Sequence, residues 1–320
     1  MKALSLFKEY VWLVNTIRKN KNISLSEINS LWVESETSEG IDITRNTFIR
    51  HKRDIEEIFG ITIECDRRNE YKYYIENEHV LDEESVQNWM ISTLSVSNML
   101  SDNIKIFNRI VLESVPSGGL NLQLLLEAMK KKVHVIIEYQ KYSDEIPYKV
   151  LIAPYCLRLF ACRWYMIGQY QRYELGEKRN KGYVNKNSYT DHLKTYSLDR
   201  IKNVCLTVER YEIAKDFNAN DYFKDYFGVF SGNSDISLER IVIRAFGVQR
   251  CYIRDLPWHV SQEIIDWKED YADFEFHLYP TNDFISHIIK FGEHVKVISP
   301  ENVANKVKGH LSAALALYDV

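Results

Sequence analysis

Apolar residues recur at the three- and four-residue steps of a helix through the first 60 residues. In the stretch 3–20 this spacing is kept by Leu4, Phe7, Val11, Val14 and Ile17. Ser24 and Glu27 precede a second apolar series with the spacing of a capping box, which predicts the start of a short helix. A third helix is predicted from about Thr44 to Phe59, with Gly60 ending it.

Two alternating stretches follow the third helix. "ITIEC" and "YKYYI" alternate apolar and polar positions, are rich in Ile and Tyr, and are separated by the polar turn "DRRNE". They predict a two-stranded hairpin. Three helices followed by a hairpin within residues 1–79 have the outline of a winged helix-turn-helix.

The third helix divides its polar and apolar residues between two sides. Phe48, Ile55 and Phe59 fall on one side of a helical wheel, whereas the opposite side is basic and amide-bearing. Arg and Asn side chains can form paired hydrogen bonds with guanine and adenine in the major groove, and basic residues in the hairpin turn can reach phosphate. The candidate DNA-binding residues are Thr44, Arg45, Asn46, Arg50, Arg53, Arg67, Arg68 and Lys72. The alternative is that this stripe is only the solvated face of a surface helix.

The rest of the chain separates into four parts. Residues 80–125 are acidic and helical, and predict a connector or a partner-packing helix pair. Residues 126–210 continue with a short helix and then β-rich stretches. These stretches are 133–142, 148–152, 155–160, 164–170, 193–198 and 201–209. The pattern is typical of a small, strongly bent antiparallel barrel, with a long, mobile, polar and basic loop before residue 193.

The C-terminal part alternates strands and helices. Residues 211–234 are an aromatic linker, and residues 235–320 predict the order β-α-β-α-β-α, as in a small ferredoxin-like module. In this prediction, residues 248–267 form a helix and a turn. The fold class is therefore α+β and multidomain.

Charge is uneven along a chain of ordinary globular composition. The chain is 45% hydrophobic and has a net charge of −4, yet residues 126–210 carry 16 Lys and Arg against nine Asp and Glu. A basic module inside an acidic chain indicates a local anionic partner.

Other functional classes lack a signal in the sequence. No membrane span, signal peptide, zinc-spaced cysteines, P-loop, GxSxG or HExxH motif is found. We therefore expect a cytoplasmic protein with reduced thiols, without catalytic residues, metal or cofactor.

Several motifs in the second half occur in one order. Trp164-Tyr165-Met166 follows Lys149 and Pro154-Tyr155, and precedes Lys194 and the series Asp199-Arg200-Ile201. With "FGVFSG" downstream, the chain resembles the WYL-domain transcriptional regulators over essentially its full length. Met166 replaces the Leu of the family motif, and Lys stands at 149 and 194 where the family favours Arg, which forms a planar fork to phosphate.

The resemblance implies an N-terminal winged helix, a central Sm-like barrel (the WYL domain) that senses a nucleic-acid or nucleotide-like effector, and a C-terminal extension (WCX). It also implies a homodimer. Because side chains alternate along a strand, Trp164 and Met166 should face the core while Tyr165 faces a surface. The candidate effector-binding residues are Tyr139, Lys149, Arg158, Arg163, Tyr165, Lys194 and Arg200. The alternative is that Tyr165 only covers a hydrophobic layer.

We therefore expect a ligand-responsive DNA-binding transcriptional regulator. A double-stranded operator would bind the N-terminal module, and effector occupancy would shift the dimer between DNA-competent and incompetent arrangements. The alternative is a single-stranded nucleic-acid-binding protein that uses the barrel as its primary site and the winged helix for protein interactions.

Overall fold

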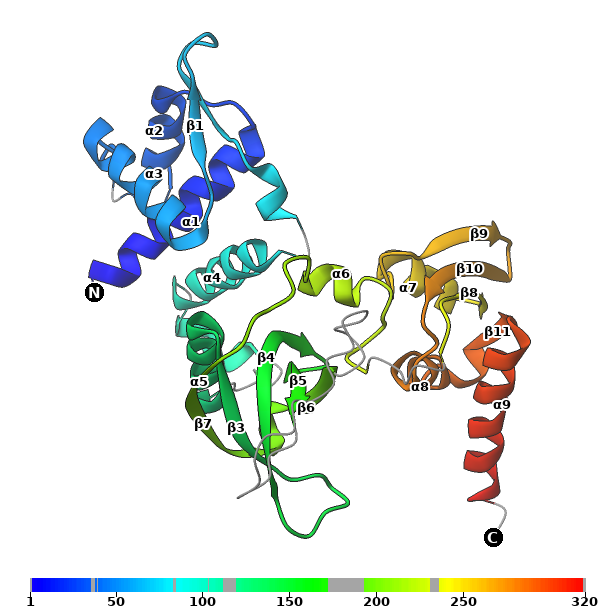
Figure 1. Ribbon diagram of the computed structural model, residues 1–320. Helices are drawn as coiled ribbons and strands as arrows, with labels where there is room; N and C mark the ends of the chain where they lie inside the picture. The colour runs from blue at the N-terminus through cyan, green and yellow to red at the C-terminus, as the bar shows by residue number, and fades with distance from the viewer. Residues whose placement is uncertain are drawn as a thin grey trace. The chain divides into compact units, whose positions relative to one another are not determined.

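The computed structural model describes residues 2–35, 38, 40–82, 85–102, 104–111, 119–171, 193–230 and 236–318. Its chain forms two compact units, residues 1–113 and 114–320 (Figure 1). The helical connector predicted at 80–125 is thus divided between the two units. The loop predicted before residue 193 lies outside the described residues. No described helix is both long and apolar enough to cross a bilayer.

The N-terminal unit begins with the elements that its periodicity predicts. Its elements are α1 (Lys2–Asn20), α2 (Leu25–Val33), α3 (Arg45–Phe59), β1 (Ile63–Asp66), β2 (Lys72–Ile75), η1 (Glu78–Leu81), α4 (Val86–Asp102) and η2 (Ile104–Arg109). Strands β1 and β2 pair antiparallel. Helix α4 packs against α1, so it adds a layer to this unit.

Local signals fix the helix ends in this unit. The capping box of α2 is present: Ser24 Oγ accepts a hydrogen bond from the Glu27 N–H, and Glu27 accepts one from the Ser24 N–H at 2.8 Å. Thr44 caps α3 by accepting from the Thr47 N–H at 3.2 Å. Gly60 ends α3 at φ +64°, a conformation that costs glycine little.

The WYL-like part of the second unit is one antiparallel sheet with a helix against it. Its elements are α5 (Gly119–Lys131), β3 (Val133–Tyr139), β4 (Tyr148–Phe160), β5 (Arg163–Gln171), β6 (Leu193–Ser197), η3 (Leu198–Arg200) and β7 (Ile201–Arg210). The strand order is β6-β5-β4-β3-β7. Leu125 and Ala128 of α5 lie in the same buried cluster as residues from all five strands.

The strands predicted for a barrel form an open sheet instead of a closed barrel. Helix η3 connects the two edge strands, but β6 pairs with β5 and β7 pairs with β3. Between the described residues of β6 and β7 no strand pairing closes the ring.

Strand β4 joins two stretches that the sequence separates at Pro154. The sequence predicts 148–152 and 155–160 as separate stretches, and Pro154 between them cannot donate to a strand ladder. The structure keeps one strand by shifting the register between Pro154 and Cys156, opposite β5. Gly168 pairs with Pro154 in that register. A Cβ on residue 168 would lie 2.4 Å from Ile152 Cγ2, so the two strands approach too closely at this point for a side chain.

An aromatic connector covers the other face of this sheet. It contains α6 (Ala219–Phe223), and Phe223 is buried in a cluster with Tyr155 and Ile167. Further along, Thr195 Oγ1 donates to the Val229 carbonyl at 3.0 Å. The connector is thereby fixed to the edge strand β6.

The C-terminal module contains one strand more than the sequence predicts. Its elements are β8 (Glu239–Phe246), α7 (Gln249–Asp255), β9 (Glu263–Trp267), β10 (Tyr271–Leu278), α8 (Asn282–Ile289), η4 (Gly292–His294), β11 (Val295–Ser299) and α9 (Glu301–Ala316). Omitting the short η4, the order is β-α-β-β-α-β, as in ferredoxin-like modules, with α9 added, and the sheet order is β11-β8-β10-β9. The prediction of a helix and turn at 248–267 is therefore wrong at residues 263–267, which form β9. This edge strand leaves Ile264, Ile265 and Trp267 exposed, so it lacks the buried alternation that identifies a strand.

Candidate functional sites

Helix α3 presents one basic face and one buried face. Phe48, His51, Ile55 and Phe59 are buried, as the spacing predicts for the apolar positions. Thr44, Arg45, Asn46, Arg50 and Arg53 are exposed. Thr44 caps the helix, and Arg53 Nη2 lies 3.7 Å from Asp54 Oδ1. The long donors of the first turns therefore face solvent from a helix whose other side is held in the core.

Buried polar contacts hold α3 on α1. His51 Nε2 lies 2.8 Å from Glu9 Oε2, and the Tyr10 hydroxyl donates to Asp54 Oδ2 at 2.8 Å. Burial and the Asp54 hydrogen bond raise the pKa of Tyr10 to about 12, and burial lowers the pKa of His51. Both groups therefore stay neutral near pH 7 and fix the direction of the basic face.

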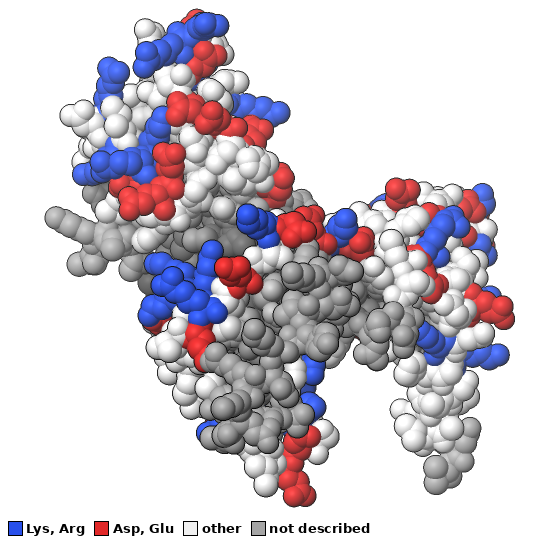
Figure 2. Space-filling model, in the orientation of Figure 1, with Lys and Arg blue, Asp and Glu red and all other residues white. Residues whose placement is uncertain are grey.

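The β1–β2 hairpin carries the second group of predicted DNA-binding residues. Arg67 and Arg68 are exposed in its turn, where the Arg68 N–H donates to Asp66 Oδ1 at 2.9 Å. Lys72 Nζ lies 3.5 Å from Glu70 Oε2, so part of its charge is neutralised. In Figure 2, Lys and Arg side chains gather around the end of this hairpin. Sequence reasoning missed Tyr71, which is 66% exposed in the same turn.

The hairpin packs directly against α3. Tyr73 of β2 pairs with Ile23 in an isolated β-bridge, and its ring centre lies 4.6 Å from that of Phe48 in α3. The hairpin is thus fixed relative to α3.

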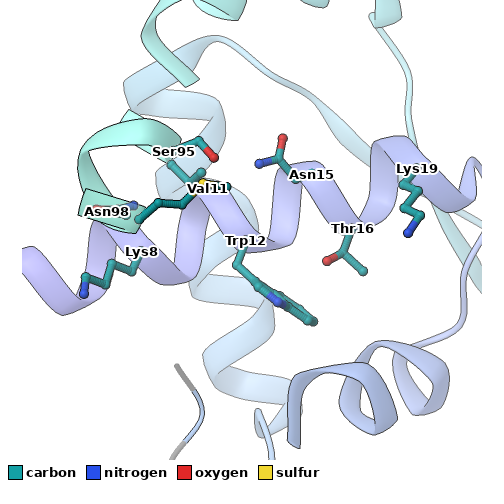
Figure 3. A pocket seen from close by; sticks show the side chains of 9 residues that line it. Lys8, Val11, Trp12, Asn15, Thr16, Lys19, Ser95 and Asn98 are labelled. Carbon is teal, nitrogen blue, oxygen red and sulfur yellow. The ribbon is translucent and has the colours of Figure 1, made fainter. Parts of the chain in front are cut away.

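A groove of about 330 Å³ lies between α1 and α4 in the same unit (Figure 3). Its walls carry both polar and apolar side chains. Its lining residues are Lys8, Val11, Trp12, Asn15, Thr16, Lys19, Ser95, Asn98 and Met99. The Trp12 ring packs edge-on against Trp32 at 4.8 Å. The groove brings together no candidate residue predicted from the sequence.

In the second unit, three strands bring Arg158, Tyr165 and Ser197 side by side. Tyr165 pairs with Arg158 on β4 and with Ser197 on β6. Arg163 lies two residues before Tyr165 and therefore on the same face of β5. The Arg158 guanidinium stacks 4.0 Å from the ring centre of Phe223 in the connector.

Arg163 and Arg200 converge on Tyr142, which the sequence did not indicate. Both arginines form hydrogen bonds with the Tyr142 hydroxyl. These bonds lower the pKa of Tyr142, and the bond with Arg163 has the larger effect. The Arg200 guanidinium lies 3.7 Å from the Tyr142 ring centre, and Arg163 Nη2 lies 3.5 Å from Asp199 Oδ2. We call Tyr142, Arg163, Asp199 and Arg200 the arginine cluster.

The arginine cluster has the chemistry of an anion site. Guanidinium groups form planar, paired hydrogen bonds with phosphate or carboxylate oxygens. Arg200 Nε is buried and makes no hydrogen bond with any described residue. The exposed Tyr142 ring and the half-buried Tyr165 ring add aromatic surface on which a base can stack.

Three other predicted effector residues pack or pair with residues outside this cluster. Tyr139 is only 5% exposed and packs in the core, 5.1 Å from Tyr196 between ring centres. Lys194 Nζ lies 4.1 Å from the Tyr170 ring centre. Lys149 is exposed and pairs across the sheet with Glu138. Trp164 and Met166 face the core, as their alternation with Tyr165 predicts.

Among the described residues, no group of three or more His, Cys, Asp and Glu side chains is arranged to hold a metal ion.

Residues 121–206 match the family model described as the WYL domain. No curated protein matches the chain.

Two solved structures align with the chain at low identity. The first is the proteasome accessory factor B/C (PafBC) of Arthrobacter aurescens, 17% identical, with a TM-score of 0.37 over 99% of this chain and 47% of that one. This chain therefore spans about half the length of that protein. The second is a CRISPR Cas-related protein, 10% identical, with a TM-score of 0.35 over 99% of this chain and 85% of that one. Both TM-scores are below 0.5, so neither alignment establishes a shared overall fold.

Proposed function

We propose that this chain, whose residues 121–206 form a WYL domain, is a ligand-responsive DNA-binding transcriptional regulator. Its N-terminal unit acts as a winged helix-turn-helix that places α3 in the major groove of an operator. The WYL domain binds an anionic nucleic-acid or nucleotide-like effector, and the protein works as a homodimer without catalysis.

The exposed basic face of α3 carries this proposal. Arg45, Asn46 and Arg50 occupy the first turns of the helix, where the recognition helices of such proteins contact base edges. Phe48, His51, Ile55 and Phe59 hold the opposite side of α3 in the core, which leaves the basic face free to meet a partner. The hairpin supplies Arg67 and Arg68 for flanking phosphates.

Duplex binding tests the proposal most simply. Arg50→Ala should weaken binding of a duplex DNA pool by about tenfold or more, since a good paired contact to a base contributes about 1–3 kcal/mol. Arg109→Ala is the matched control, because Arg109 is an exposed arginine of the same unit outside α3 and the hairpin. Equal binding by both variants would refute a recognition role for α3.

The arginine cluster is the proposed effector site. Its two guanidinium groups can bind one anionic group together, and a base can stack on the neighbouring tyrosine rings. A double variant, Arg163→Ala with Arg200→Ala, should weaken binding of a labelled single-stranded oligodeoxynucleotide by about tenfold or more. Lys149→Ala, which removes an exposed cation elsewhere on the sheet, should leave it unchanged.

The same cluster supports the second candidate, a protein whose primary ligand is single-stranded nucleic acid. Exposed aromatic rings beside cations are the usual surface for single strands. If single strands bind through the arginine cluster while duplex binding is absent or independent of Arg50, this second function replaces the first.

A further inference from the structure

An isoleucine lies within the basic face of α3. Ile49 is 52% exposed, and it occupies the row of the helix surface between Arg45 and Arg53, four residues from each. Asn46 and Arg50 flank it on the neighbouring row. The surface that would face the bases is therefore not uniformly polar.

An exposed isoleucine brings no local advantage to a helix. Its β-branched side chain has a lower helix propensity than Lys, Arg or Glu, and its apolar surface stays hydrated. Single exposed apolar residues are common, however, so exposure alone indicates nothing. The significance of Ile49 lies in its neighbours, which are the long donors suited to base edges.

The major groove offers one apolar group to such a residue. Thymine carries a C5 methyl there, whereas the other base-edge groups are hydrogen-bond donors and acceptors. An isoleucine between Arg45 and Arg53 can bury its methyl groups against that C5 methyl while the donors bind neighbouring bases.

We propose that Ile49 is a specificity-determining residue that contacts the C5 methyl of a pyrimidine in the operator. This inference rests on the proposed function, because it requires α3 to enter the major groove. It adds a chemical feature to the operator, namely a methylated pyrimidine opposite the row of α3 that Arg45, Ile49 and Arg53 form. Thymine and 5-methylcytosine both supply that methyl group.

The test removes the methyl group from the DNA without changing any donor or acceptor. A duplex enriched from a random pool by the full-length protein is synthesised with deoxyuridine replacing each thymine in turn. At each sensitive position, cytosine and 5-methylcytosine are compared as well. One thymine replacement should weaken binding by about fourfold, the value expected for losing one buried methyl group.

The protein variants assign that effect to Ile49. Ile49→Ala should bind the thymine duplex about fourfold more weakly and should no longer distinguish thymine from uracil. Ile58→Ala is the matched control, because Ile58 is 42% exposed on the same helix but lies about 180° around it from Ile49. It should keep the full discrimination. Thermal unfolding of both variants checks that α3 still folds.

The outcomes separate this inference from the proposed function. Methyl dependence that disappears in Ile49→Ala supports the inference, whether the methyl belongs to thymine or to 5-methylcytosine. Duplex binding that depends on Arg50 but not on any pyrimidine methyl, or methyl dependence that survives Ile49→Ala, overturns the inference alone. Absence of duplex binding overturns both.

Discussion

Replacing His287 with Phe is expected to make the C-terminal module less sensitive to acid. His287 lies on α8 with its ring centre 4.5 Å from that of Trp258 and 4.6 Å from that of Phe227. Its Nε2 is buried and makes no hydrogen bond with a described residue. Burial disfavours the imidazolium form, Lys290 repels it, and the pKa of His287 falls to about 4.

The sign and size of the effect follow from this pKa. The unfolded chain binds a proton below about pH 6.5, whereas folded His287 does not until about pH 4. The free energy of unfolding therefore decreases as pH falls through this window, by about 1.4 kcal/mol per pH unit at its steepest. At about pH 5 the loss reaches about 2 kcal/mol relative to neutral pH.

Urea unfolding of the wild type and His287→Phe at several pH values measures this contribution. All other histidines are present in both proteins, so the difference between the unfolding free energies of the two proteins isolates His287. The variant should gain about 2 kcal/mol relative to the wild type between neutral pH and about pH 5. Parallel pH profiles would refute the assignment of a neutral, buried imidazole.

Two further pairs of substitutions test the fold. Gly168→Ala should destabilise the second unit by about 2 kcal/mol or more, because the new Cβ would meet Ile152. Gly309→Ala places its Cβ in open space and should stabilise α9 by up to about 1 kcal/mol. Thermal unfolding compares the two variants. Ser24→Ala should cost about 1 kcal/mol by removing the cap of α2, and Ser24→Gly should cost only a few tenths, so equal losses in chemical denaturation would contradict the capping role.

Local patterns in the sequence determine much of the DNA-binding candidate. The faces of α3 follow from helical periodicity alone, since Phe48 and Ile55 are buried while Asn46 and Arg50 are exposed. The capping box and the hairpin also depend on neighbouring residues. Features of this kind need no knowledge of tertiary contacts.

Features that depend on distant contacts were not predictable in the same way. Tyr142 lies between β3 and β4, Arg163 begins β5 and Arg200 ends η3, so the three meet only because of the topology of the sheet. The buried position of Tyr139 likewise depends on Tyr196, 57 residues away in the sequence. Strand β9 was missed because an exposed edge strand has no buried side to generate alternation.

Binding of duplex DNA by the basic face of α3 is the core of the proposed function. The most direct measurement is fluorescence anisotropy of labelled duplex and single-stranded DNA, with the wild type and Arg50→Ala, at two salt concentrations. We expect duplex binding that weakens as salt rises, because phosphate contacts release counterions, and that is largely lost in the variant. Binding of single strands only, unchanged by Arg50→Ala, would contradict it.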